Sequence, residues 1–353
     1  MAEAAGAPTV KIADRVVGAG APSFIVAEAG ANHNRDLGMA RELIAVASEA
    51  GADAVKFQTY SAETLYSRRT PDFSYLKALT DRSTWQLIKD IELPREWQAE
   101  LAAEARKRGI LFMSTPFDRQ AVDELDALGV PAFKIASFEI VDLPLVRYAA
   151  VRGRPMIIST GLADYEDVQD VVSACRSEGN DHVVLLQCAS LYPAPPSRIN
   201  LRAMETMRRA FGVPVGLSDH TLGIHVSVAA AALGASVIEK HYTLSRQLKG
   251  PDHPFAIEPG ELRDLVRQVR EVEAALGDGR KLGPAPDELE MHQKARRSLV
   301  AACAIPRGVV IGPEMLTIKR PGFGIKPKHA ALVIGRVARR DIDEDEVVTW
   351  DML

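Results

Sequence analysis

The sequence predicts an α/β fold, a (β/α)8 barrel, followed by a small β-rich second domain. About eight short apolar runs alternate with helical segments over roughly 250 residues, which is the length and rhythm of such a barrel. Polar residues end nearly every run, whereas a doubly wound sheet would collect them at one switch point and carry a Gly-x-Gly-x-x-Gly motif after its first strand. A Gly- and Pro-rich break over 277–286 separates these repeats from a turn-rich C-terminal segment.

Four segments are expected along the chain. Residues 1–22 read as a tail followed by a hairpin, within 10–17, that closes one end of the barrel. The barrel occupies 23–280, a linker 281–293 and the second domain 294–353. This last segment is too short to hold much core of its own, so it should dock against another surface.

The barrel strands are predicted from apolar, β-prone runs that end in a polar residue. In order they are 23–28, 54–58, 110–114, 132–137, 155–159, 182–187, 214–217 and 235–238. Asp118 is a suitable N-cap for one of the helices. The helices with clear apolar spacing are 37–50, 95–108, 118–128, 165–178, 223–233 and 258–276. The connection 59–93 is unusually long, and such loops are often lids.

Composition limits the class of protein. The 353 residues carry a formal net charge of -4 without a Lys/Arg block, so no nucleic-acid partner is expected. Three widely spaced cysteines form neither a disulfide framework nor a thiolate metal motif. The first residues lack the basic and apolar regions of a signal peptide, and no apolar run approaches the ~20 residues that span a bilayer. We therefore expect a cytoplasmic protein with no membrane partner.

Two histidines follow the last two predicted strands, in Gly216-Leu217-Ser218-Asp219-His220-Thr221 and Ile238-Glu239-Lys240-His241. The carboxyl ends of parallel strands meet at one edge of a barrel, where ligands bind. Two neutral imidazoles there suit a divalent metal with open coordination positions. The alternative is a pair of unrelated histidines that cap strands.

Two lysines, Lys56 and Lys134, stand inside apolar strands, where an ammonium group needs partners. With neighbouring hydroxyls they would bind an oxyanion such as phosphate or carboxylate, while Glu28 and Glu139 could orient hydroxyls or move protons. The polar side chains expected at one barrel mouth are Glu28, Lys56, Gln58, Thr115, Lys134, Ser137, Glu139, Ser159, Thr160, Tyr192, Ser218, Asp219, His220, Glu239 and His241.

Several of these residues have a second interpretation. Either lysine could form a Schiff base with a carbonyl substrate. Ser159 and Thr160 are equally explained as helix caps, and Cys188 is interpreted as a buried core thiol. Asp252 could bind a sugar hydroxyl or form an Asx turn. His182 and His225 are not expected to be metal ligands, and the role of His33 is left open.

The order of the strand-end motifs is similar to that of the sialic acid (nonulosonic acid) synthase family, from about Phe24 to the C-terminus. That family condenses phosphoenolpyruvate with an N-acylated hexosamine to make nine-carbon acids. The motifs are Ala27-Glu28-Ala29-Gly30-Ala31-Asn32-His33, Val55-Lys56-Phe57-Gln58-Thr59, Ser114-Thr115-Pro116-Phe117, Phe133-Lys134-Ile135-Ala136-Ser137-Phe138-Glu139, Ser159-Thr160-Gly161, Gly216 to Thr221, Glu239-Lys240-His241, Gly250-Pro251-Asp252 and Lys319-Arg320-Pro321-Gly322.

The resemblance implies a barrel joined to a domain like type III antifreeze proteins, in a domain-swapped homodimer. It implies Mn²⁺ or Mg²⁺ on His220 and His241, and Arg320 reaching the partner's site toward the N-acyl group. The residues implied to hold phosphoenolpyruvate are Lys56, Thr115, Lys134, Ser137, Ser159 and Ser218, with Thr160 beside them. Those implied for the open-chain sugar and the proton transfers are Glu28, Gln58, Glu139, Tyr192 and Asp252, and Lys134 is also expected to take part in the chemistry.

Departures from the family pattern leave the acceptor sugar open. Ser190 stands where the neuraminate enzymes carry asparagine, Arg35 replaces a glycine, and Arg296-Arg297-Ser298 replaces an aromatic-containing segment. Other motifs resemble the pseudaminic acid branch on one side and the neuraminate, legionaminate and spore-coat branch on the other. Two further functions remain as alternatives, a Schiff-base pyruvate aldolase or lyase, and an ice- or glycan-binding role for 294–353.

Overall fold

The computed structural model describes residues 8–73 and 82–353, so the first residues of the predicted tail and part of the predicted 59–93 connection lie outside the described residues. The chain forms two compact units, the first ending at Gly277 and the second spanning Asp278–Leu353, and each is described by itself. Within the described ranges, no helix combines the length and the apolar character needed to cross a membrane.

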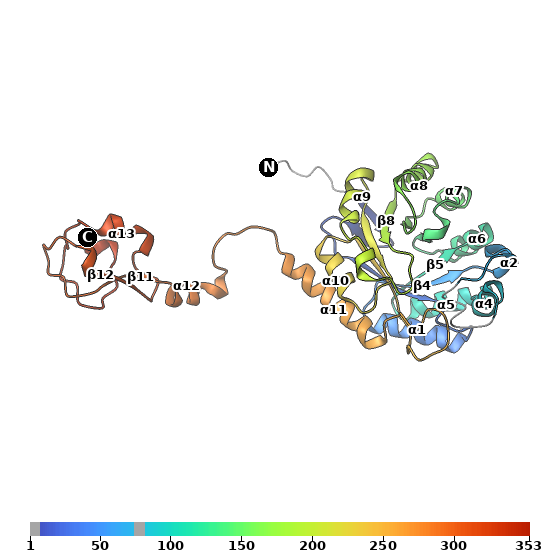
Figure 1. Ribbon diagram of the computed structural model, residues 1–353, viewed down its shortest axis with the longest axis horizontal. Helices are drawn as coiled ribbons and strands as arrows, with labels where there is room; N and C mark the ends of the chain where they lie inside the picture. The colour runs from blue at the N-terminus through green and yellow to red at the C-terminus, as the bar shows by residue number, and fades with distance from the viewer. Residues whose placement is uncertain (1–7, 74–81) are drawn as a thin grey trace. The chain divides into compact units, whose positions relative to one another are not determined.

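The first unit is a nearly closed barrel of eight parallel strands (Figure 1). Its hydrogen-bonded order is β5-β4-β3-β10-β9-β8-β7-β6, and β5 and β6 approach each other where the ladder is interrupted. The (β/α)8 prediction is confirmed. The strands are β3 Phe24–Gly30, β4 Ala54–Thr59, β5 Leu111–Pro116, β6 Phe133–Ile135, β7 Met156–Ser159, β8 Val183–Cys188, β9 Val215–Asp219 and β10 Val237–His241.

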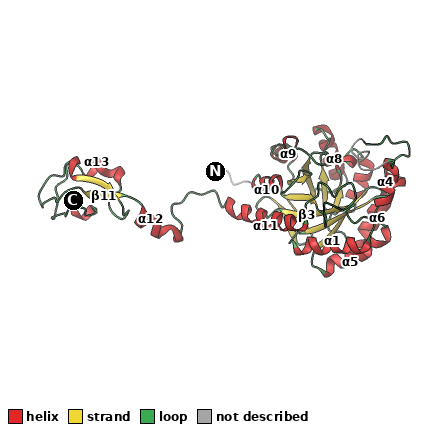
Figure 2. Cartoon of the chain, turned by 60° about the horizontal axis from the view of Figure 1, so that its bottom comes forward, coloured by secondary structure: helices red, strands yellow, loops and turns green. Residues whose placement is uncertain are grey.

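Helices surround these strands (Figure 2), because a parallel strand is buried on both faces and its outer side chains need a cover. All seven residues of β3 are buried, for example. The helices are α1 Leu37–Glu49, α2 Ala62–Leu65, α4 Thr84–Ile91, α5 Gln98–Lys107, α6 Arg119–Leu128, α7 Leu143–Ala150, α8 Tyr165–Ser177, α9 Ala203–Phe211, α10 His225–Ala232 and α11 Pro259–Leu276. Asp118 caps α6 by accepting a hydrogen bond from the Ala121 amide, as the sequence indicated.

A hairpin covers the end of the barrel from which the strands start. Its strands β1 Thr9–Ile12 and β2 Arg15–Gly18 pair antiparallel. Val10, Ile12 and Val17 pack in one apolar cluster with residues from six of the eight barrel strands, such as Phe24. Burial at this end leaves the opposite, carboxyl end of the strands for ligands.

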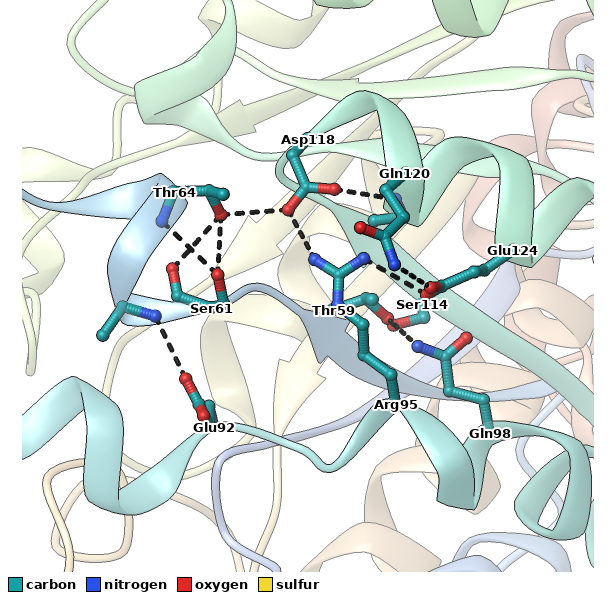
Figure 3. A network of polar contacts seen from close by, with 12 residues as sticks. Thr59, Ser61, Thr64, Glu92, Arg95, Gln98, Ser114, Asp118, Gln120 and Glu124 are labelled. Carbon is teal, nitrogen blue, oxygen red and sulfur yellow. Dashed lines mark hydrogen bonds and ion pairs between the residues drawn. The ribbon is translucent and has the colours of Figure 1, made fainter.

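The long connection after β4 contains α2 and α4, which the sequence did not predict. A polar network holds its described parts (Figure 3). Thr64 Oγ1 donates to Asp118 Oδ2 over 3.0 Å, and the Ala62 amide donates to Glu92 Oε2 over 3.1 Å. Arg95 pairs with both Asp118 and Glu124, so the connection is fastened to the start of α6.

Three other segments differ from the prediction. The predicted strand 132–137 ends at Ile135, and Ser137–Glu139 forms a 3₁₀ turn, η2, because Ser137 turns to accept a hydrogen bond from the Gly161 amide. The helices α7 and α9 occupy stretches for which no helix was specified. Both helices are short, with eight and nine residues, so each shows few repeats of the apolar spacing, and α7 also carries a proline in its first turn.

The second unit has a core of its own, although the sequence analysis expected it to hold little. Its strands β11 Ser298–Ala301 and β12 Leu316–Lys319 pair antiparallel. A helix, α12 Leu289–Ala295, begins within the last part of the predicted linker, and α13 Ala330–Val333 is a single turn. The buried cluster consists of Leu299, Ala301, Ile305, Ile311, Ile325, Val333, Ala338, Ile342, Val348, Met352 and Leu353.

Candidate active site

A polar cavity of about 50 Å³, here called the catalytic cavity, lies at the carboxyl ends of the barrel strands. Every barrel strand or the residues directly after it contribute to its lining. Such convergence follows from strand geometry, because inward-facing residues of parallel strands alternate and end at one edge. The lining residues are Glu28, Lys56, Gln58, Thr115, Phe117, Lys134, Ala136, Ser137, Ser159, Cys188, Tyr192, Ser218, His220, Glu239 and His241.

Two lysines and two carboxylates form the centre of the catalytic cavity. Lys56 Nζ lies 2.6 Å from Glu28 Oε2 and 3.5 Å from Glu239 Oε1. Lys134 Nζ lies 3.8 Å from the same Glu239 oxygen. All four side chains are buried, so these charges interact with little screening by water. Glu239 therefore stands between the two ammonium groups.

The pKa values of the lysines move in opposite directions. Burial opposes the charge on Lys56, but Glu239 and Glu28 outweigh it and raise the Lys56 pKa. Burial lowers the pKa of Lys134, and Glu239 at its longer distance does not compensate fully. Lys56 therefore stays protonated, whereas a second anion near Lys134 would stabilise the charged form of that lysine.

Hydroxyl groups surround the ammonium groups. Lys56 Nζ donates to Thr115 Oγ1 over 3.1 Å, and Lys134 Nζ donates to Ser159 Oγ over 2.7 Å. The alternative role of Ser159 as a helix cap is wrong, since Asp164 caps α8. Ser137 Oγ accepts from the Gly161 amide over 3.0 Å. A Cβ at Gly161 would lie 2.8 Å from that oxygen, so glycine keeps this position open.

The two histidines face each other, with ring centroids 5.4 Å apart. His220 Nδ1 lies 2.9 Å from the Ala189 carbonyl oxygen, which can only accept, so this nitrogen carries the proton and Nε2 keeps a lone pair. His241 Nδ1 is buried without a hydrogen-bond partner, and burial holds the His241 pKa well below its usual value.

In their neutral form these imidazoles fit a divalent metal, because His220 keeps its proton on Nδ1 and His241 Nδ1 has no hydrogen-bond partner. The pKa of His241 is low, whereas Cys188 outweighs the effect of burial and raises the pKa of His220, so an ion competes with a proton there. The nearest carboxylate oxygen to His241 Nδ1 is Asp252 Oδ2, at 3.6 Å. Among the residues that the structure describes, no group of three or more His, Cys, Asp or Glu side chains is arranged around one metal position. The donor set for an ion is therefore the histidine pair, with open positions for other ligands.

Three carboxyl groups near the catalytic cavity have raised pKa values. Burial raises the pKa of Glu28 to about 7 against the opposing charge of Lys56, and Gln58 Nε2 donates to Glu28 Oε1 over 2.7 Å. Burial also raises the pKa of Glu139 to about 7 and that of Asp252 to about 6. Carboxyls that titrate near neutral pH are suited to proton transfer.

Some predicted site residues lie elsewhere. Thr160 Oγ1 donates to the Leu186 carbonyl and faces a separate hollow near α8 and α9. Asp219 does not face the mouth, because it bonds to Lys240 and to Ser227 of α10 outside the barrel wall. Glu139 lies beside the catalytic cavity without lining it, and Arg320 belongs to the second unit.

Sequence reasoning assigned no site role to two residues of the catalytic cavity. Glu239 was recognised as a strand-end residue but given no role, although its parity with His241 places it on the inner face of β10. Cys188 was interpreted as a core thiol, yet its Sγ lies 3.7 Å from His220 Nδ1. His220 and, more weakly, Lys134 lower the Cys188 pKa despite its burial.

Comparisons with known proteins agree with this geometry. The model of the NeuB family matches residues 43–281, and that of the SAF domain matches residues 296–353. N,N'-diacetyllegionaminic acid synthase of Campylobacter jejuni is 40% identical over 92% of this chain and 98% of its own length. Human N-acetylneuraminate-9-phosphate synthase is 36% identical over 96% and 95%. The N-acetylneuraminic acid synthetase structure from Leptospira borgpetersenii superposes with a TM-score of 0.72 at 35% identity, over 80% of this chain and 95% of that one.

Proposed function

The chain belongs to the NeuB family, and from this premise we propose that it condenses phosphoenolpyruvate with an open-chain N-acylated hexosamine to give a nonulosonic acid and phosphate. The observation that carries the proposal is the single cavity that holds Lys56, Lys134, His220 and His241. Two ammonium groups suit a phosphate and a carboxylate, and two imidazoles suit an ion beside them.

Phosphoenolpyruvate would bind between the two lysines. Lys56 Nζ and Lys134 Nζ both lie within 4 Å of the same oxygen of Glu239. The serine and threonine hydroxyls next to them can donate to anionic oxygens. A phosphate on this side would stabilise the protonated form of Lys134, which burial disfavours. The hydroxyls proposed to assist are those of Thr115, Ser137, Ser159 and Ser218.

The acceptor aldehyde would lie toward the histidines. His220 and His241 would hold Mn²⁺ or Mg²⁺, which supplies a Lewis acid that polarises the aldehyde carbonyl. Glu28, Gln58 and Asp252 would then border the sugar hydroxyls. The Tyr192 ring lies at the same end, tilted against that of His220 with the centroids 4.3 Å apart. Neutral imidazoles are needed for this role. The low pKa of His241 favours it, whereas the pKa of His220 is raised beside Cys188, so the ion would compete with a proton on that ring.

The bond changes balance as follows. C3 of the enol attacks the aldehyde carbon and forms the new C–C bond, while the aldehyde oxygen takes a proton. Water adds at C2 and loses a proton, for which the Glu139 carboxylate is the proposed acceptor. The C2–O bond to phosphate then breaks as the new C2 hydroxyl passes its proton to the departing phosphate, so that hydrogenphosphate leaves with the bridging oxygen and C2 becomes a ketone. Lys134 would stabilise the departing phosphate and so take part in the chemistry.

Three further properties are part of the proposal. Arg320 of a second copy would contact the N-acyl group in a domain-swapped homodimer, since a free guanidinium can donate to an amide oxygen. The protein would act in the cytoplasm, where phosphoenolpyruvate is available. Thr160, whose hydroxyl is bonded to the Leu186 carbonyl, would contribute through the position of its backbone rather than by touching the phosphate.

A Schiff-base aldolase is the second candidate, because the lowered pKa of Lys134 is also what a nucleophilic lysine needs. One experiment separates the two. Purified protein with Mn²⁺ is given phosphoenolpyruvate labelled with ¹⁸O at the bridging position, with and without N-acetylmannosamine or a 2,4-diacetamido hexose. Phosphate release that requires the sugar and carries the label supports the proposal. Borohydride trapping of pyruvate on Lys134, with no such release, would establish the aldolase instead.

A further inference from the structure

Two loops beside the catalytic cavity carry motifs that the proposed reaction uses only in part. One follows β3 and contains Asn32-His33-Asn34, and the other follows β10 and contains Gly250-Pro251-Asp252-His253. Because β3 and β10 pair in parallel, the two loops leave neighbouring strands at the same edge of the barrel. Of these residues, Asp252 alone borders the acceptor in the proposed function.

The His253 side chain is fully buried and has a hydrogen-bond partner at each ring nitrogen. Its Nε2 lies 3.1 Å from Asn34 Oδ1 in the loop after β3, and its Nδ1 lies 2.6 Å from Thr243 Oγ1. An amide oxygen only accepts, so Nε2 carries the proton and Nδ1 accepts from the Thr243 hydroxyl. Burial lowers the His253 pKa to about 4, so the ring is neutral at pH 7, as these two bonds require.

The position of this ring depends on a glycine and is shared by the residue before it. A Cβ at Gly250, where φ is +154°, would lie 2.7 Å from His253 Cδ2 and 3.1 Å from the amide oxygen that accepts the ring's hydrogen bond. Pro251 and Pro254 flank Asp252 and His253, and each proline restricts its own backbone and that of the residue before it. The bonds of His253 therefore fix the backbone of Asp252 as well.

The Asp252 carboxylate lies against the site from this segment. Its Oδ2 is 3.6 Å from His241 Nδ1, and a Cβ at Gly30 would lie 3.0 Å from the same oxygen and 3.4 Å from Glu28 Oε1. Asp252 and His241 also line a cavity of about 160 Å³ that adjoins the catalytic cavity. A misplacement of ~1 Å near reacting groups can cost ~100-fold in rate, so the loop that carries this carboxylate must be held.

We propose that His253 is a positioning residue for the acceptor sugar, which locks the two loops together and so holds the Asp252 carboxylate in place. Its anchors are Thr243 on one side and Asn34 on the other. The inference rests on the proposed function, in which Asp252 borders the sugar. It gives His253 no contact with a substrate and no proton transfer. Phosphoenolpyruvate, held between the two lysines, should bind independently of His253.

A matched pair of variants tests the lock in the full-length protein with Mn²⁺, phosphoenolpyruvate and N-acetylmannosamine or a 2,4-diacetamido hexose. Thr243→Val keeps the shape of the side chain but leaves His253 Nδ1 without a donor, whereas Thr243→Ser keeps the hydroxyl and loses a methyl group. We expect Thr243→Val to raise the acceptor KM about tenfold. The KM for phosphoenolpyruvate, and both KM values of Thr243→Ser, should stay within about twofold of the wild type. An unchanged acceptor KM in Thr243→Val, or an equal rise for both substrates, would overturn the inference.

A second comparison asks whether the effect passes through Asp252. Residues that act as one unit are not additive, so in the Asp252→Ala protein the change Thr243→Val should raise the acceptor KM by less than about twofold. A further rise of about tenfold there would overturn the inference and leave the proposed function standing. No phosphate release by the wild-type protein with either sugar would overturn both.

A measurement on the wild-type protein keeps the inference testable even where Thr243→Val does not fold. Nuclear magnetic resonance of metal-free protein labelled with ¹⁵N-histidine reports the tautomer of each ring, and the His253 signals are those lost in His253→Gln. We expect a neutral ring with its proton on Nε2 at pH 7. A proton on Nδ1, or a charged ring, would remove the hydrogen bonds that form the lock and overturn the inference.

Discussion

Substitution of Lys240 by methionine tests how the fold holds the two histidines at their spacing. Lys240 Nζ lies 3.0 Å from Asp219 Oδ2 and also donates to the Thr221 carbonyl. Asp219 accepts further hydrogen bonds from Ser227 Oγ at 2.6 Å and from the Thr221 amide at 2.9 Å. Each member of this buried pair immediately precedes a histidine, so the pair ties the ends of β9 and β10 together behind the catalytic cavity.

The structure sets the size of the effect. Lys240→Met leaves the Asp219 carboxylate buried without its cation, a change that costs ~3–5 kcal/mol in comparable pairs. The two remaining hydrogen bonds place Asp219 near the low end of that range, about 3 kcal/mol, which is still a large part of a domain stability of ~5–15 kcal/mol. In Asp219→Asn/Lys240→Met no charge is stranded, and an amide oxygen can still accept, so the loss should shrink to about 1 kcal/mol.

Denaturation with guanidinium chloride, followed by tryptophan fluorescence, provides the stabilities. Trp350 lies in the second unit, so Trp350→Phe in every protein restricts the signal to tryptophans of the barrel unit. Mn²⁺ affinity, measured by calorimetry, provides a readout that a purely structural role would not change; we expect a loss of about tenfold in Lys240→Met and partial recovery in the double variant. If the double variant is as unstable as Lys240→Met, stranded charge is not the cause. Unchanged Mn²⁺ affinity in both would refute the positioning argument.

Three further predictions concern the proposed reaction. His241→Ala should abolish Mn²⁺-dependent phosphate release while its unfolding midpoint stays near that of the wild type; normal turnover would remove the metal assignment. Arg320→Ala should raise KM for the acceptor at least tenfold with little change for phosphoenolpyruvate, and an unchanged acceptor KM would contradict the swapped dimer. Glu139→Gln should lower kcat about 100-fold or more at pH 7. Because a carboxyl with a pKa of about 7 loses its ionised form about 16-fold between pH 7 and 5.5, the wild-type-to-variant rate ratio should fall by that factor, and a constant ratio would exclude Glu139 as the base.

Much of the barrel and its mouth could be predicted from the alternation of apolar strands with amphipathic helices. Parallel strands buried on both faces give continuous apolar runs. A lysine inside such a run, as at Lys56 or Lys134, is rarely structural, because a buried ammonium group needs partners. Because the carboxyl ends of all strands meet at one edge, residues far apart in sequence could be assigned to one place. Lys56 and Thr115 are 3.1 Å apart across 59 positions of sequence.

The remaining features depend on information that a strand pattern does not contain. Asp219 is a strand-end residue like Ser218, and only the alternation of side chains along β9 sends it outward to Lys240. Thr160 follows Ser159 and is likewise directed away from the cavity. The distance of Glu239 from both lysines is set by the register of β10 against β3 and β9, which no local pattern specifies.

The charge balance of the catalytic cavity explains why four ionisable groups are buried together. Glu239 has a lowered pKa, because two lysines oppose the effect of burial, whereas the pKa of Glu28 is raised to about 7. With Glu28 protonated, two ammonium groups and one carboxylate leave one net positive charge, and a divalent ion on the histidines would bring two more. The total is equal and opposite to the charge of fully ionised phosphoenolpyruvate.

Without substrate, Glu239 and Glu28 limit the repulsion between Lys56 and Lys134, so the cavity can form before the anion binds. Preorganisation and anion affinity are therefore served by the same two carboxyl groups, one that stays charged and one that can give up its charge.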